Sequence, residues 1–115
     1  MAVYTRGGLA PSALRRVRDY IDTHLDQNIR LQMLAKAAGL SVYHFARVFK
    51  DEVGVPPHGY LLQQRVERAR EMLANTELPL SKGALAAGFA DQSHLARHFR
   101  RFLGVSPSLV RRSRS

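Results

Sequence analysis

The sequence predicts an all-α fold of about seven helices, with two helix-turn-helix lobes joined by a long linking helix. Apolar residues recur at helical spacing along most of the chain, and no segment convincingly alternates as a β-strand would. Residues 41–57, SVYHFARVFKDEVGVPP, recur in related form as DQSHLARHFRRFLGVSP at residues 91–107. This repeat favours an internal duplication, and therefore two similar lobes.

Composition limits the class of protein. The 115 residues, of which 45% are apolar, suffice for one compact domain or for two very small lobes that share a helix. There is no cysteine for a disulfide or a thiolate nucleophile, no run of 18 apolar residues, and no signal peptide in MAVYTRGGLAPSA. We therefore expect a soluble, cytoplasmic protein that does not use a membrane.

Charge indicates an anionic partner. Lys and Arg outnumber Asp and Glu by 18 to 9, which gives a formal net charge of +9. No acidic residue follows Asp91, whereas six arginines do. An uncompensated positive patch of this kind suits phosphate groups, although a merely solvated basic surface is the alternative.

The first lobe is expected over residues 12–56, after a flexible lead at residues 1–11 that contains Gly7, Gly8 and Pro11. Ser12 is the expected N-cap of a helix that ends near residues 26–28. A short helix over residues 31–38 stops at Gly39, and the next helix covers residues 42–53. Two helices that meet at a glycine turn are typical of a helix-turn-helix motif.

The linking helix is expected over residues 57–74, its regular part beginning at His58 after two prolines, and the second lobe over residues 75–112. Within that lobe the sequence predicts a turn at residues 75–79, a short helix over 81–87 that ends at Gly88, and a longer helix between the N-cap Asp91 and Gly104. A last half-turn reaches Val110. The basic residues that follow, including the tail at 113–115, are expected to fray.

In the helix after Asp91, apolar and charged side chains lie on opposite faces. At about 100° per residue, its apolar side chains fall on one side and its arginines on the other. The linking helix would span roughly 25 Å, and with the thickness of the lobes this approaches the roughly 34 Å between successive major-groove openings. The alternative is a helical bundle whose duplicated helices only pack, which does not explain matching arginines on both outer faces.

The exposed positions differ in the DNA groups that they suit. Arginines in the middle of each face can hold guanine O6 and N7, first-turn side chains enter a groove first, and later basic residues meet phosphate. The alternative for each is an ordinary surface residue. The mid-face residues are Arg47 and Arg97, the first-turn residues are Tyr43, Gln92, Ser93 and His94, and the phosphate contacts are Lys50, Arg100, Arg101, Arg111 and Arg112.

Other chemistry has little support in the sequence. His94 and His98 are four residues apart and could share a metal ion, but no Glu or Cys completes a ligand set nearby and the neighbouring arginines would repel a cation. No nucleophile elbow and no phosphate-binding glycine loop occurs. We therefore expect no catalytic residue, no metal, no cofactor and no enzymatic activity.

Three segments resemble the AraC/XylS family of transcriptional regulators: LAKAAGLSVYHFARVFKDEVGVPPHGYL, RVERAREML and AAGFADQSHLARHFRRFLGVSPSLVRR. The resemblance covers nearly all of residues 14–112 and implies a seven-helix domain over residues 12–112 that inserts two recognition helices into adjacent major grooves of promoter DNA. It implies base contacts from Tyr43, Ala46, Arg47, Gln92, Ser93, His94 and Arg97. Ala46 departs from the longer polar residue of other members and would touch only a thymine methyl group.

The resemblance also implies partners and a location. We expect a sequence-specific regulator of transcription, an activator rather than a repressor, at the bacterial nucleoid in the cytoplasm. The alternatives are a module that docks on RNA polymerase and a non-specific nucleic-acid-packaging protein. The domain itself is expected to be monomeric, and dimeric when part of a longer chain. Gly83, where the family has a bulky aliphatic residue, is expected to weaken the second lobe.

Overall fold

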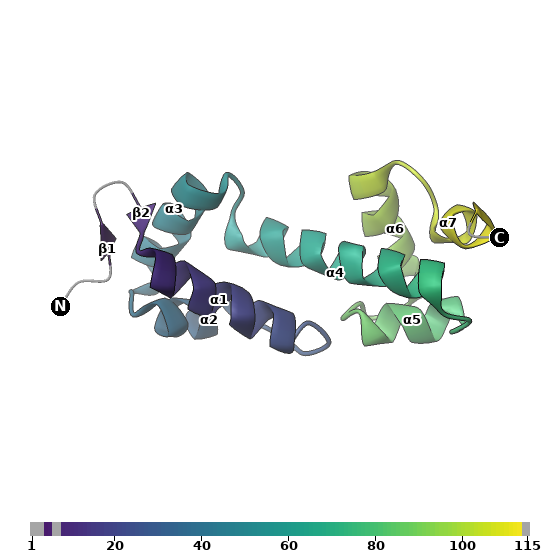
Figure 1. Ribbon diagram of the computed structural model, residues 1–115, viewed down its shortest axis with the longest axis horizontal. Helices are drawn as coiled ribbons and strands as arrows, with labels where there is room; N and C mark the ends of the chain where they lie inside the picture. Colours follow the sequence, from purple (N-terminus) through teal and green to yellow (C-terminus); the bar gives the residue numbers. More distant parts are fainter. Residues whose placement is uncertain (1–3, 6–7, 114–115) are drawn as a thin grey trace. The chain divides into compact units, whose positions relative to one another are not determined.

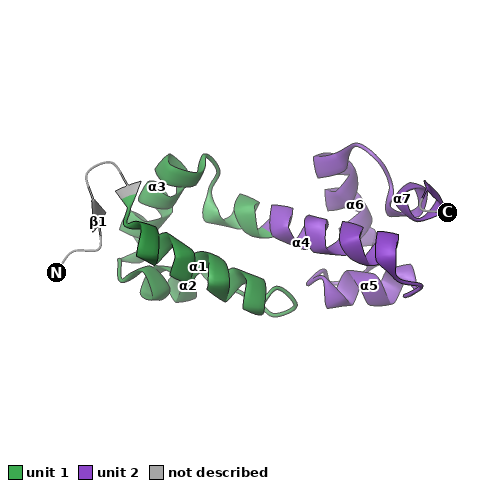
Figure 2. Ribbon diagram, viewed as in Figure 1, with its two compact units in different colours: residues 1–61 green, residues 62–115 purple. Residues whose placement is uncertain are grey.

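The computed structural model describes residues 4–5 and 8–113. Among these residues it contains seven helices and one short hairpin, which confirms the predicted all-α class (Figure 1). The chain divides into two compact units, residues 1–61 and residues 62–115 (Figure 2). The helices are α1 (Pro11–Thr23), α2 (Leu31–Ala38), α3 (Val42–Val53), α4 (Pro57–Asn75), α5 (Leu80–Ala86), α6 (Gln92–Leu103) and α7 (Pro107–Ser113).

The hairpin is a difference from the prediction that the chain holds no strand. Strand β1 (Tyr4–Thr5) pairs antiparallel with β2 (Gly8–Leu9), and Tyr4 lies opposite Leu9. Strands of two residues are too short to produce an alternating pattern in a sequence. β2 lies against α3, and the Leu9 side chain is buried in the core of unit 1. The rest of the predicted flexible lead at residues 1–3 and 6–7, and residues 114–115 of the tail, fall outside the described residues.

Helix α1 begins and ends differently from the prediction. Pro11 is its first residue, a position that suits proline because the first N–H of a helix has no partner within it. The helix ends at Thr23, where the prediction was residues 26–28. His24 leaves the helix, and both its backbone N–H and its ring Nδ1 approach the Tyr20 carbonyl, the latter at 2.8 Å. Residues 24–27 therefore form a turn.

The core of unit 1 joins the helix-turn-helix pair to α1. Gly39 adopts φ 75°, and the N–H of Leu40 reaches back to the Ala35 carbonyl at 3.0 Å, which closes the end of α2. The Ser41 hydroxyl then accepts from the His44 N–H and caps α3. The buried apolar residues are Leu9, Ala13, Val17, Ile21, Leu25, Leu34, Ala35, Ala38, Phe45, Val48, Phe49 and Leu61.

Unit 2 repeats this plan with different side chains. The Asp91 carboxylate accepts from the His94 N–H at 2.8 Å and caps α6, as the sequence predicts. Gly104, with φ 75°, ends the helix where Gly54 ends α3. The core consists of Leu62, Val66, Ala69, Leu73, Ala84, Ala87, Phe89, Leu95 and Phe99.

Helix α7 extends beyond the predicted half-turn and does not end at Val110. Arg111 lies within it, and its guanidinium donates to the carbonyl oxygens of Leu73, Thr76 and Leu78. These acceptors lie at the C-terminal end of α4 and in the turn after it, where helix carbonyls lack partners within the helix. Arg111 thereby fastens α7 to the rest of unit 2.

We expect Arg111→Ala to lower the free energy of unfolding of unit 2 by about 1–3 kcal/mol, because three carbonyls lose a charged donor. Urea unfolding followed by circular dichroism measures this. The control is Arg97→Ala, which removes the same charge from an exposed residue of α6 in the same unit. Equal midpoints for the two variants would show that the Arg111 contacts do not stabilise the fold.

Substitution of Gly83 is a second test of what determines the stability of unit 2. It lies inside α5, and a Cβ built there meets no atom within 4 Å, so nothing in the packing requires glycine. Gly83→Ala should raise the free energy of unfolding by about 0.5–1 kcal/mol through helix propensity, and Gly83→Leu by about 1–3 kcal/mol if its side chain is covered. Thermal melting measures both.

The control for Gly83 is Gly104→Ala. A Cβ at Gly104 also meets no atom within 4 Å, but its φ of +75° strains any side chain. This variant should melt at a lower temperature than the parent. A fall in the midpoint of Gly83→Ala as well would contradict the view that glycine is unnecessary in α5.

Candidate nucleic-acid interface

Each unit contains one helix-turn-helix motif, α2–α3 in unit 1 and α5–α6 in unit 2. The second helix of each motif has twelve residues, an oxygen-bearing N-cap side chain and a left-handed glycine at its C-cap. One face of each is buried, so the opposite face is fixed toward solvent. We call the exposed residues of α3 and α6 the two recognition faces.

The recognition face of α6 is strongly basic. Leu95 and Phe99 are fully buried on the opposite side. Arg101 also approaches the Phe102 ring, with its guanidinium carbon 5.9 Å from the ring centroid. The exposed residues of this face include Gln92, Ser93, Arg97, Arg100 and Arg101, all of them predicted DNA contacts.

The recognition face of α3 contains fewer of the predicted residues. Phe45 and Phe49 are buried, with ring centroids 5.4 Å apart. Tyr43, in the first turn, is 77% exposed. Arg47 and Lys50 are exposed one and two turns later. A phenol, a guanidinium and an ammonium group are thus available on one side of α3.

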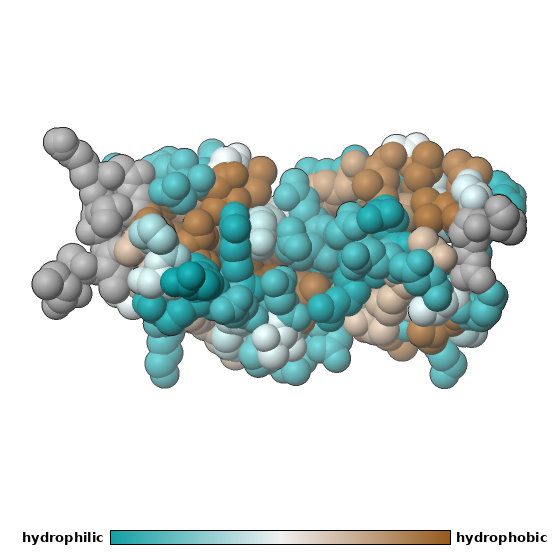
Figure 3. Space-filling view, in the orientation of Figure 1, coloured by the Kyte–Doolittle hydropathy of each residue, from teal (hydrophilic) through white to brown (hydrophobic). Residues whose placement is uncertain are grey.

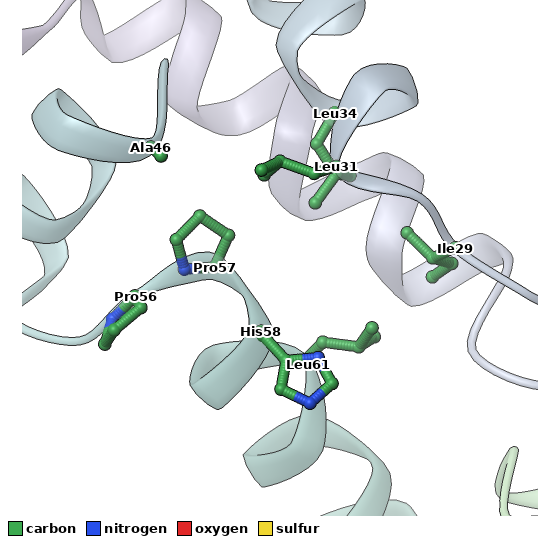
Figure 4. A pocket seen from close by; sticks show the side chains of 8 residues that line it. All are labelled: Ile29, Leu31, Leu34, Ala46, Pro56, Pro57, His58 and Leu61. Carbon is green, nitrogen blue, oxygen red and sulfur yellow. The ribbon is translucent and has the colours of Figure 1, made fainter. Parts of the chain in front are cut away.

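Ala46 is only partly on this face. It is half-buried and lines an apolar hollow of about 250 Å³ in unit 1 (Figure 4). Its methyl group is shared between the recognition face and this hollow, which makes it the least accessible of the three predicted base contacts of α3. The other lining residues are Ile29, Leu31, Leu34, Pro56, Pro57, His58 and Leu61.

His94 is held by its neighbours in the α5–α6 turn. Its ring packs edge-on to Phe89 at 5.6 Å between centroids, and its Nε2 lies 3.1 Å from Nε2 of His98. Its Nδ1 accepts a long hydrogen bond of 3.4 Å from the Ala90 N–H. The structure therefore places this predicted base contact partly inside the motif, where it fastens the turn to the helix.

His94 and His98 are two neighbouring side chains that could together bind a metal ion. In residues 8–113 and the short strand before them, no group of three or more His, Cys, Asp or Glu residues is arranged to hold a metal ion. Among the same residues, no helix has the length and apolar character needed to cross a membrane.

Arg111 and Arg112 are both predicted phosphate contacts, but their surroundings in the structure differ. Arg112 is exposed on α7, whereas the Arg111 guanidinium is directed at three backbone carbonyls of its own unit. The prediction that Arg111 contacts phosphate does not fit this arrangement, because its donors already have acceptors. Asp51, which is exposed on α3, is not among the predicted contacts. The repeat could have drawn attention to it, because Asp51 occupies the position of Arg101.

Unit 2 also exposes apolar surface. Leu103 at the end of α6 and Leu109 on α7 are both exposed, and Figure 3 shows brown apolar surface over these helices beside teal hydrophilic side chains. Leu85 of α5 is exposed as well. These side chains lie outside the predicted set of DNA contacts.

Comparison with known proteins identifies the family. A family model described as a helix-turn-helix domain matches residues 34–113. The HTH-type transcriptional activator AarP of Providencia stuartii is 32% identical over 102 residues, which cover 89% of this chain and 76% of AarP. The chain spans only about a third of the length of several other curated relatives, 33% to 37%.

Solved structures agree with this result. A Chromobacterium violaceum transcriptional regulator of the AraC-type DNA-binding class has a TM-score of 0.85 and 25% identity, covering 90% of this chain and 93% of that one. The DNA-binding domain of AdpA, solved in complex with a target DNA, has a TM-score of 0.82 and 32% identity, covering 88% and 91%. The chain belongs to the AraC/XylS family of helix-turn-helix transcriptional regulators.

Proposed function

We propose that this chain binds double-stranded promoter DNA sequence-specifically, as the DNA-binding part of a transcription activator. The observation that carries the proposal is the pair of helix-turn-helix motifs, each of which buries an apolar face of its second helix and exposes basic side chains on the other side. The similarity to a domain solved with its target DNA, and to an activator, supports it.

The roles of the residues follow from their exposure and chemistry. Arg47 and Arg97 are mid-helix and exposed, and we assign them to guanine edges. Tyr43, Gln92 and Ser93 are assigned to bases from the first turns. Ala46 and His94 are assigned lesser base contacts, because both are half-buried. The phosphate contacts are Lys50, Arg100, Arg101 and Arg112.

We further propose that the two recognition helices enter adjacent major grooves. The helix between the motifs, α4, is continuous over 19 residues, which corresponds to about 28 Å of rise. This length is of the order of the repeat of the groove on one side of the DNA, about 34 Å. A single chain can then read two half-sites without a partner subunit, so we expect the domain to bind as a monomer.

Three alternative functions predict different binding behaviour. A packaging protein binds unrelated DNA as tightly as any chosen sequence, and a polymerase-docking module binds RNA polymerase without a promoter. A dimer of a longer chain would bind paired sites. Selection of binding sites from random DNA with the purified domain, followed by competition with unrelated DNA, tests the proposal: an enriched motif supports it, and the absence of any motif overturns it.

Affinity for the selected site should fall steeply with salt. If the basic surface neutralises about 6–10 phosphates, the plot of log K against log salt has a slope of about −5 to −9. Fluorescence anisotropy at several salt concentrations measures it. A nearly flat plot would show that the net charge of +9 does not serve DNA binding.

Arg97→Ala should weaken binding by about 1–3 kcal/mol and relax the preference at one or two base pairs, because a bidentate contact to guanine is lost. Site selection with the variant measures both effects. The control is Arg101→Ala on the same helix, which should weaken all sequences by similar factors and make the salt slope less negative by about 1. An unchanged motif for Arg97→Ala would identify Arg97 as a phosphate contact.

A further inference from the structure

The two recognition faces differ in charge at one corresponding position. The duplicated helices match Arg47 with Arg97 and Lys50 with Arg100, and in both pairs the charge is positive. At the next position, however, α3 has Asp51 where α6 has Arg101. Both side chains are exposed. Each lies one turn after the mid-helix arginine, and therefore on the same side of its helix.

The two helices, and the two units, also differ in their balance of acidic and basic residues. On α3, Asp51 and Glu52 offset Arg47 and Lys50, whereas on α6 the three exposed arginines meet no acidic residue within the helix. Residues 1–61 contain eight Lys or Arg and five Asp or Glu, and residues 62–115 contain ten and four. The excess of positive charge therefore lies mainly in unit 2.

The Asp51 carboxylate is available to act on DNA. Within the part of the chain that the structure describes, Asp51 forms no ion pair with Arg47 or Lys50. Where α3 approaches a phosphate backbone, the Asp51 carboxylate on its recognition face repels the phosphates, and favourable contacts must offset this cost. Base contacts supply such an offset only on a matching sequence.

We propose that Asp51 is a specificity-determining residue that keeps unit 1 off unrelated DNA. Unit 2 then supplies the non-specific affinity through its arginines, and unit 1 engages only where Tyr43 and Arg47 find matching bases. The inference rests on the proposed function, because it concerns how the same two faces divide the work of DNA recognition.

The first test uses a matched pair of alanine variants. Each phosphate contact is worth about fivefold in affinity at 0.15 M salt, from a slope of about 0.9 per contact. On unrelated DNA, Arg100→Ala should weaken binding about fivefold, whereas Lys50→Ala should weaken it much less. On the selected site, both variants should weaken binding. Equal losses for both on unrelated DNA would overturn the proposal, because unit 1 would already be engaged there.

The second test reverses the charge. Asp51→Arg should let unit 1 bind unrelated DNA, so that the salt slope there steepens by about 2–3 as residues 47, 50 and 51 all gain phosphates. On the selected site, only the new contact is added, and the slope should steepen by about 1. The ratio of specific to non-specific affinity should therefore fall by about 5- to 30-fold. Asp51→Asn should lower it less.

The control is Asp19→Arg, which makes the same change in net charge on the exposed side of α1 and should leave the ratio unchanged. Thermal melting checks that each variant is folded. A ratio unchanged in Asp51→Arg, or lowered equally in Asp19→Arg, would overturn the role of Asp51. Failure of the parent domain to select any motif would instead overturn the proposed function, so the two failures are distinguishable.

Discussion

The rest of the structure depends on the burial of one apolar face on each recognition helix. Phe45 and Phe49 on α3, and Leu95 and Phe99 on α6, have no exposed surface. Burying one such side chain stabilises a fold by about 1.5–3 kcal/mol, so rotating either helix about its axis would be costly. Because the rotation is fixed, a side chain two positions away is necessarily exposed. The orientation of Arg47 and Arg97 is thus a consequence of core packing.

Much of this arrangement could be predicted from the sequence, because local signals fix the ends of several helices. The bounds of α2 and α3, and both caps of α6, agree with the prediction, since glycines in the left-handed region and capping oxygens act within a few residues. The ends of α1 and α7 were wrong for a different reason. His24 turns back onto Tyr20, and Arg111 binds carbonyls more than thirty residues away in the sequence.

The exposure of the candidate site residues could likewise be predicted only in part. Positions in the centre of a helix face, such as Arg97, are exposed as helical periodicity predicts. Positions at the boundary between the two faces depend on what other elements bring to them. Ala46 is half-buried because α2 and the start of α4 form a hollow beside it, and His94 because Phe89 of the preceding turn meets its ring. Periodicity within one helix contains no information about either neighbour.

The duplication shows that fold and electrostatics are specified by different positions. Ser41 and Asp91 differ in charge yet both cap a helix N-terminus through a side-chain oxygen, because the cap requires only an acceptor. Buried positions likewise exchange Phe45 for Leu95 while the same face stays in the core. Exposed positions carry no such constraint, and there the two motifs differ in sign, as Asp51 and Arg101 do. Two motifs of one fold can therefore meet DNA with different charge, without loss of stability in either core.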